Sequence, residues 1–170
     1  MSASALENLK VLIVEDNQHM RSLLRTLLNS VGVRDVIEAN DGTTALTALR
    51  DRKCDLVLSD LAMKPMDGLE FSRHVRTSEH SPNPFLPIIM ITGHTEKHRV
   101  EAARDAGVTE FLAKPITASS LFSRLAEIVE RPRAFVRTDA YFGPDRRRKN
   151  IENYGGPWRR HDDFQDIAVQ

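Results

Sequence analysis

The sequence predicts a doubly wound α/β domain, a parallel β-sheet covered by helices on both faces. Two observations predict it. Five short apolar segments, rich in β-branched residues, are too short for helices, and amphipathic stretches with helical spacing separate them. Because strands that alternate with helices through short links are joined by right-handed crossovers, we expect the five strands to run parallel.

The expected elements follow one another along the chain. Apolar runs predict strands at 11–14, 36–39, 56–58, 88–91 and 110–112. Apolar residues that recur every three or four positions predict helices over 20–28, 45–49, 69–75, 100–106 and 121–129. Arg131, Pro132 and Arg133 end this pattern after Glu130. We therefore expect one domain at residues 1–130 and a separate, irregular tail at residues 131–170.

The composition fits a globular domain followed by a segment of opposite net charge. The chain has 170 residues, 41% of them hydrophobic, which is enough for a core. Residues 1–130 contain 15 Lys and Arg against 18 Asp and Glu, whereas residues 131–170 contain 9 against 6. Cys54 has no second cysteine to pair with, and no apolar run reaches the roughly 18 residues of a membrane helix. These features predict a cytoplasmic protein without membrane insertion.

Polar residues follow four of the predicted strands. They are Glu15 and Asp16 after the first strand, Asp60 after the third, Thr92 after the fourth and Lys114 after the fifth. The carboxyl ends of the strands line the ligand crevice of a doubly wound fold, so these side chains are expected to converge. Three carboxylates in one crevice repel one another, and a hard divalent cation relieves that repulsion. Mg²⁺ is therefore the expected ion, and Lys114 and Thr92 suit a phosphoryl group received by a neighbouring carboxylate.

Four motifs, in this order and spacing, resemble the CheY-like receiver domains of two-component response regulators. They are VLIVEDN at 11–17, DLAMKPMDG at 60–68, MITG at 90–93 and FLAKP at 111–115. The resemblance implies a flavodoxin-like receiver fold with strand order 2-1-3-4-5 and, as partner, a histidine kinase or a phosphotransfer protein. Lys64 stands where the family often has proline, and Pro65 follows it, which affects the shape of the loop rather than its chemistry.

The same resemblance implies a role for each residue of the crevice. Asp60 would be the phosphorylated nucleophile, and the Mg²⁺ ligands would be Glu15, Asp16, Asp60 and the carbonyl of Ala62. Thr92 and Lys114 would contact the phosphoryl oxygens, and a cis peptide would precede Pro115. Phe111 would be the aromatic residue that moves inward with Thr92 on phosphorylation.

Simpler interpretations exist for single residues of this set. Asp16 followed by Asn17 is also the pattern of a helix cap, and Phe111 taken without the family would be a core residue. The agreement of four separate motifs favours a phosphorylation site over a chance pattern.

Residues 135–164 mix aromatic residues, arginines and acids more densely than ordinary linkers do. Arginines hold phosphates and read the O6/N7 edge of guanine, aspartates accept from its N1 and N2 hydrogens, and aromatic rings stack on purines. The residues concerned are Tyr141, Asp145, Arg146, Arg147, Arg148, Tyr154, Trp158, Arg159, Arg160, Asp162 and Asp163. With DRRR at 145–148 and PWRRHDD at 157–163, this segment resembles the arginine-rich C-terminal extension of the Cle proteins. That resemblance implies that the tail binds cyclic di-GMP and that the protein docks on a flagellar motor switch protein.

Two other interpretations of the tail stay open. It could be a basic arm of a single-domain phosphorelay regulator that binds nucleic acid or an acidic protein, although the interleaved acids argue against nucleic acid. It could also be a structural tail that packs back on the domain. An output enzyme or a helix-turn-helix domain is disfavoured, since only 40 residues follow Glu130. The sequence thus predicts a signalling adaptor and no enzyme.

Overall fold

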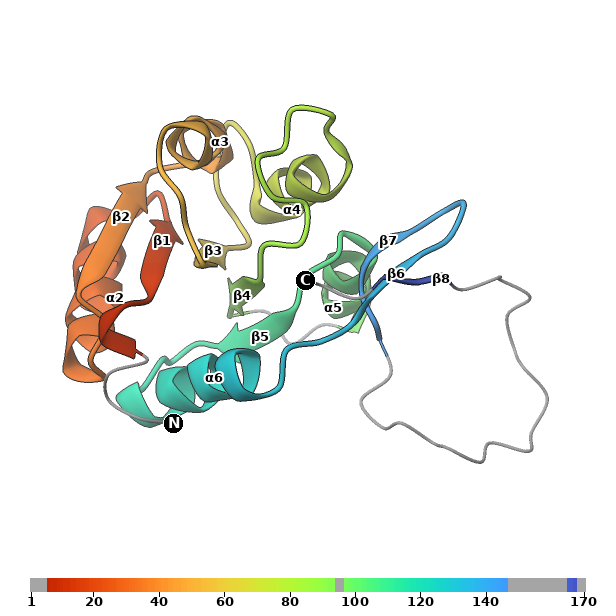
Figure 1. Ribbon diagram of the computed structural model, residues 1–170. Helices are drawn as coiled ribbons and strands as arrows, with labels where there is room; N and C mark the ends of the chain where they lie inside the picture. The colour runs from red at the N-terminus through yellow and green to blue at the C-terminus, as the bar shows by residue number, and fades with distance from the viewer. Residues whose placement is uncertain (1–5, 94–96, 147–164, 168–170) are drawn as a thin grey trace.

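The computed structural model describes residues 6–93, 97–146 and 165–167, and its larger part is a five-stranded parallel sheet (Figure 1). The strands are β1 (Lys10–Val14), β2 (Asp35–Ala39), β3 (Leu56–Asp60), β4 (Ile88–Thr92) and β5 (Glu110–Ala113), in the order β2-β1-β3-β4-β5. The predicted fold and strand order are confirmed. Each strand extends slightly beyond its apolar run, because polar end residues such as Asp60 and Thr92 still pair with the neighbouring strand.

Helices cover both faces of this sheet. On one face α2 (Gln18–Ser30) packs with α6 (Ala118–Glu130), and on the other α3 (Gly42–Asp51) packs with α4 (Gly68–Thr77) (Figure 1). The remaining helix, α5 (Lys97–Asp105), connects β4 to β5. No helix in the described part of the chain is long and apolar enough to cross a membrane.

The core explains why the strands read as continuous apolar runs. Val11 and Ile13 belong to the hydrophobic cluster on the α2 and α6 side, whereas Leu12 and Val14 belong to the cluster on the α3 and α4 side. Successive side chains of a strand point to opposite faces of the sheet. Because both faces are covered, all four of these side chains are fully buried, and the alternation typical of a half-exposed strand is absent.

The segment after α6 contains strands, which corrects the expectation of an irregular tail. β6 (Phe135–Arg137), β7 (Phe142–Pro144) and β8 (Gln165–Ile167) form an antiparallel sheet in the order β7-β6-β8. We call residues 133–146, which include β6 and β7, the C-terminal hairpin. Sequence patterning missed these strands because each has three residues, too few for a periodicity. Contacts with the domain stabilise β6 and β7.

Gly68, the first residue of α4, packs directly under the end of β3. Its N–H donates to the carbonyl oxygen of Leu61 at 3.1 Å. A Cβ atom at position 68 would lie 2.3 Å from the carbonyl oxygen of Asp60 and 2.9 Å from Sδ of Met90. No larger residue fits there unless the backbone that carries Asp60 moves.

Gly68→Ala is therefore expected to lower the free energy of unfolding by about 1–3 kcal/mol, the usual cost of overpacking, as measured by urea denaturation. Gly93→Ala is the matched control, because a Cβ there would lie 3.8 Å from the nearest atom, Cδ of Lys114. An equal loss of stability in the two variants would contradict the steric explanation.

Candidate functional site

Three strand ends bring a cation and two carboxylates together at one edge of the sheet. Glu15 follows β1, Asp60 ends β3 and Lys114 follows β5. Nζ of Lys114 lies 2.8 Å from Oδ1 of Asp60 and 3.8 Å from Oε2 of Glu15. The predicted convergence of these three residues is thus present in the structure.

Asp60 is held in one orientation by two hydrogen bonds. Oδ1 accepts from Nζ of Lys114, and Oδ2 accepts from the N–H of Ala62 at 3.0 Å. The residue is 5% exposed. Hydrogen bonds to an ionised group are stronger than those between neutral groups, so the carboxylate is fixed at the mouth of the crevice before any reaction.

Glu15 is a buried carboxylate that is only half satisfied. It is 2% exposed, and Oε1 accepts from the N–H of Asn17 at 3.1 Å. Oε2 has no hydrogen-bond partner in the described part of the chain. Burial, with the charge of Asp60, raises the pKa of Glu15 to about 6, although the Asn17 N–H and Lys114 oppose this shift. A buried oxygen acceptor without a donor suits a cation.

Lys114 is held as an ammonium group by its neighbours. Burial tends to lower its pKa, but the hydrogen bond and the charge of Asp60 raise the pKa above its usual value, and Glu15 and Asp16 add to the rise. The backbone N–H of Lys114 also donates to the carbonyl oxygen of Thr92 at 3.0 Å. Thr92, which ends β4, is thereby placed beside the ion pair.

The peptide bond before Pro115 is cis, as the family resemblance implied, and the bond between Lys64 and Pro65 is cis as well. The second of these lies in the loop where Lys64 departs from the family pattern, between β3 and α4.

Asp16 lies exposed at the rim of the crevice and is not the cap of α2. The cap is Asn17, whose Oδ1 accepts from the N–H groups of His19 at 2.9 Å and Met20 at 3.1 Å. The alternative interpretation of Asp16 as a helix cap is therefore wrong, and its carboxylate has no capping role.

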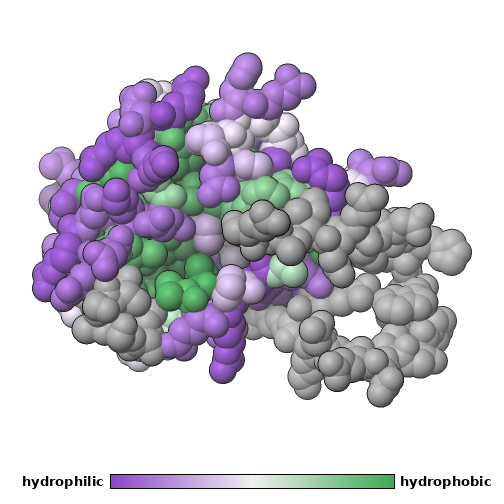
Figure 2. Space-filling model, viewed as in Figure 1, coloured by the Kyte–Doolittle hydropathy of each residue, from purple (hydrophilic) through white to green (hydrophobic). Residues whose placement is uncertain are grey.

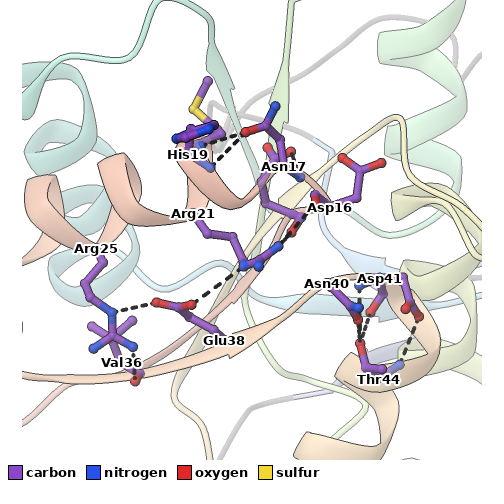
Figure 3. A network of polar contacts seen from close by, with 12 residues as sticks. Asp16, Asn17, His19, Arg21, Arg25, Val36, Glu38, Asn40, Asp41 and Thr44 are labelled. Atoms are coloured by element: carbon purple, nitrogen blue, oxygen red, sulfur yellow. Dashed lines mark hydrogen bonds and ion pairs between the residues drawn. The ribbon is translucent and has the colours of Figure 1, made fainter.

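A network that the sequence did not reveal supports the backbone of the first two acids (Figure 3). Nη1 of Arg21 donates to the carbonyl oxygens of Glu15 at 2.6 Å and Asp16 at 3.3 Å. Glu38 on β2 pairs with Arg21 at 3.6 Å and with Arg25 at 2.6 Å. No local motif joins α2 to β2, so only the fold could show that these residues position the acids.

The oxygen donors at this edge fit Mg²⁺ by their chemistry. Glu15, Asp16 and Asp60 supply carboxylates, and Ala62, which is exposed, follows Asp60 closely in the chain. Within residues 6–93 and 97–146, no three His, Cys, Asp or Glu side chains lie arranged as a metal cage. Lys114 instead contacts two of the carboxylates. Among the described residues, Oε2 of Glu15 has no hydrogen bond and only the ammonium group of Lys114 at 3.8 Å, and this buried oxygen is the observation that favours a cation.

Phe111, on β5, packs half-buried against a small apolar cluster that includes Met90 and Ala103. It also lines a cavity with Tyr141 and Arg146 of the C-terminal hairpin. Both interpretations of Phe111, as a core residue and as a switch residue next to an exposed face, are compatible with this position.

Three of the predicted tail residues are described, and all lie in the hairpin. The guanidinium of Arg146 lies 4.1 Å from the ring centroid of Tyr141 and pairs with Asp105 at 2.8 Å. The N–H of Asp145 donates to the carbonyl oxygen of Ala134 at 2.8 Å. The other predicted tail residues lie outside the described residues: Arg147, Arg148, Tyr154, Trp158, Arg159, Arg160, Asp162 and Asp163.

Known sequences similar to this chain are receiver domains and chemotaxis proteins. The family described as response regulator receiver domain matches residues 11–126, a stretch that ends before the C-terminal hairpin. Chemotaxis protein CheY-3 of Vibrio cholerae is 36% identical over 131 residues, 77% of this chain and 99% of that protein. Chemotaxis protein CheY of Pseudomonas aeruginosa is 36% identical over 123 residues, 72% of this chain and 98% of that protein.

Solved structures show the same fold. Chemotaxis protein CheY4 of Vibrio cholerae superimposes with a TM-score of 0.65 at 31% identity, over 71% of this chain and 98% of its own. The receiver domain of a sensor histidine kinase from Pseudomonas aeruginosa superimposes with a TM-score of 0.64 at 28% identity, over 72% of this chain and 98% of its own. That second structure has a magnesium ion coordinated in its active-site cleft.

The raised pKa of Glu15 predicts a pH dependence of the metal-free protein. Glu15 binds its proton more tightly when folded, so its favourable contribution is complete below its ordinary pKa of 4.5 and is lost as the pH rises through about 6. In urea denaturation with a chelator present, the free energy of unfolding of the wild type should fall by roughly 1–2 kcal/mol between these two pH values. Glu15→Gln should abolish this fall. The same pH profile in the variant and the wild type would show that Glu15 is not the group responsible.

Proposed function

The chain belongs to the family of response regulator receiver domains, and on this premise we propose that it is a signalling protein that receives a phosphoryl group on Asp60 from a histidine kinase or a phosphotransfer protein. One observation carries the proposal: Asp60 is a fixed carboxylate at a strand end, with the ammonium group of Lys114 at 2.8 Å. A nucleophile and a compact positive charge beside it are what phosphoryl transfer requires.

The proposed step forms an acyl phosphate. A carboxylate oxygen of Asp60 attacks the phosphorus atom, the bond from phosphorus to the donor breaks, and its electron pair leaves with the donor. Lys114 and the hydroxyl of Thr92 stabilise the negative charge on the phosphoryl oxygens. Bound at Glu15, Asp16, Asp60 and the Ala62 carbonyl, Mg²⁺ would supply further neutralisation of that charge.

Acetyl phosphate with Mg²⁺ should therefore add one phosphoryl group to the full chain, with acetate as the leaving group, as measured by intact mass. Asp60→Asn should abolish the addition, because the amide is not a nucleophile. Asp51→Asn is the matched control, since Asp51 is exposed at the end of α3, and it should label like the wild type. If Asp60→Asn still gains the phosphoryl group, Asp60 is not the acceptor.

We further propose that the tail binds cyclic di-GMP and that the nucleotide regulates docking on a partner such as a flagellar motor switch protein. The arginines, aspartates and aromatic residues between 141 and 163 support this, because together they match both the phosphates and the guanine edges. Two of the related proteins are named for chemotaxis, which favours a partner in the motility machinery.

The contacts of the hairpin favour a second candidate function. Arg146 is already paired with Asp105 and covers the ring of Tyr141, so these two residues would have to leave the domain before they could hold a nucleotide. A tail that serves the domain structurally, or as a protein-binding arm of a phosphorelay regulator, would need no such release.

Calorimetry with the full chain separates the two candidates. Recognition of the base edge should favour cyclic di-GMP over cyclic di-AMP, because the hydrogen-bond donors and acceptors of adenine are reversed. Arg147→Ala, Arg160→Ala or Trp158→Ala should each weaken the binding free energy of cyclic di-GMP by about 1–3 kcal/mol. Arg137→Ala removes the same charge outside these motifs and should leave the affinity nearly unchanged. Equal affinity for both dinucleotides, or binding of neither, would support the second candidate.

A further inference from the structure

An aromatic cluster holds the C-terminal hairpin against the domain. Phe135 and Phe142 meet Phe85, which precedes β4, with ring centroids 5.1 and 5.3 Å apart, close to edge-to-face geometry. The guanidinium of Arg76 lies 5.1 Å from the centroid of Phe135, and its Nε donates to the carbonyl oxygen of Gly107 at 3.0 Å. The hairpin is thus seated at the amino-terminal ends of β4 and β5, the end of the sheet opposite Asp60.

Two ion pairs join the hairpin to α5 and β5. Arg133 pairs with the buried carboxylate of Glu110, which immediately precedes Phe111 in β5. Arg146 pairs with Asp105, which ends α5. Both arginines belong to the hairpin, and both acids belong to the receiver domain. A displacement of β5 or α5 would therefore alter the contacts that hold the hairpin.

The hairpin also leaves Phe111 little room. Phe111, Tyr141, Pro144 and Arg146 share one cavity of about 20 Å³, which holds roughly one water molecule. Movement of Phe111 toward the interior would remove a ring from this cavity. The hairpin side chains that line the cavity would then lose their van der Waals contact with that ring.

The strand β5 connects this surface with the phosphorylation site. Its first residue, Glu110, holds Arg133, and Lys114, directly after its last residue, holds Asp60. Lys114 lies four positions after Glu110, a span of roughly 13 Å along an extended strand. Among the strands that the structure describes, β5 lies at the edge of the sheet and pairs with β4 alone, so one neighbour in the sheet restrains its displacement.

A phosphoryl group on Asp60 would act on this strand directly. It would bring roughly two negative charges to the position where Lys114 now contacts Oδ1. The ammonium group would follow the new phosphoryl oxygens, and Thr92, whose carbonyl accepts from the Lys114 N–H, would follow with it.

From these contacts we propose that the C-terminal hairpin reads the phosphorylation state of Asp60 through β5 and is released from the domain when Asp60 is phosphorylated. The inference rests on the proposed phosphorylation of Asp60 and is independent of nucleotide binding. Since the arginine-rich segment begins at the end of the hairpin, release of the hairpin would also free Tyr141 and Arg146 for a ligand.

Hydrogen exchange of the full chain, with and without acetyl phosphate and Mg²⁺, tests this proposal. Peptides from residues 133–146 should exchange at least about threefold faster when Asp60 is phosphorylated, because local opening sets the exchange rate. Peptides from β2 and α3 should not change, and intact mass measured in parallel reports the phosphorylated fraction.

Two variants identify the route. Arg133→Gln removes the contact with Glu110, so the hairpin should exchange fast in both states and no longer respond, although Asp60 still takes the phosphoryl group. Arg137→Gln is the matched control, since Arg137 stacks 4.3 Å from the centroid of Phe142 within the hairpin and should preserve the response.

The outcomes separate the inference from the proposed function. A phosphorylated wild type whose hairpin exchanges as before would overturn the inference and leave the phosphorylation intact. A wild-type response in Arg133→Gln would overturn the route through Glu110. A chain that gains no phosphoryl group at all would overturn both the inference and the proposed function.

Discussion

The ion pair between Asp60 and Lys114 is the interaction on which the site depends, since it joins the end of β3 to the end of β5 across the strand between them. The sheet places two acids and one cation where parallel strands end, and the cation offsets a repulsion that the fold itself creates. Gly68 allows α4 to begin directly beneath the carbonyl of Asp60, and the Lys114 N–H bonds to Thr92. The nucleophile is therefore held by packing and by charge at the same time.

The acids of this crevice differ in their burial. Glu15 is enclosed and keeps one oxygen without a hydrogen bond, whereas Asp16 is exposed at the rim. Arg21, which pairs with Glu38, holds the backbone that carries both acids. The backbone positions of the two carboxylates are therefore fixed, although their solvation differs. Such an arrangement stores unfavourable electrostatic energy that a cation or a proton relieves.

The hairpin makes β5 a shared element of two surfaces. Lys114 at one end of the strand belongs to the phosphorylation crevice, and Glu110 at the other end belongs to the seat of the hairpin. The backbone of β5 is extended and pairs with β4 from Glu110 to Ala113, so the two contacts lie at opposite ends of one regular element. Residues far apart in the chain are in this way connected by a short physical path.

The sequence by itself determined the alternation of strands and helices, the strand order once the family was recognised, and the residues of the crevice, because apolar runs and strand-end polar residues are local patterns. Tertiary structure alone decided which acid is buried, that Asn17 rather than Asp16 caps α2, and that Arg21 and Glu38 support the site. It also decided that the segment after α6 folds back on the domain, since the hairpin is held by Phe85, Arg76 and Glu110. These three residues lie between 23 and 59 residues earlier in the chain than the residues they contact. Contacts across such distances leave no periodicity in a sequence, because each depends on where the sheet and its helices have already placed the partner.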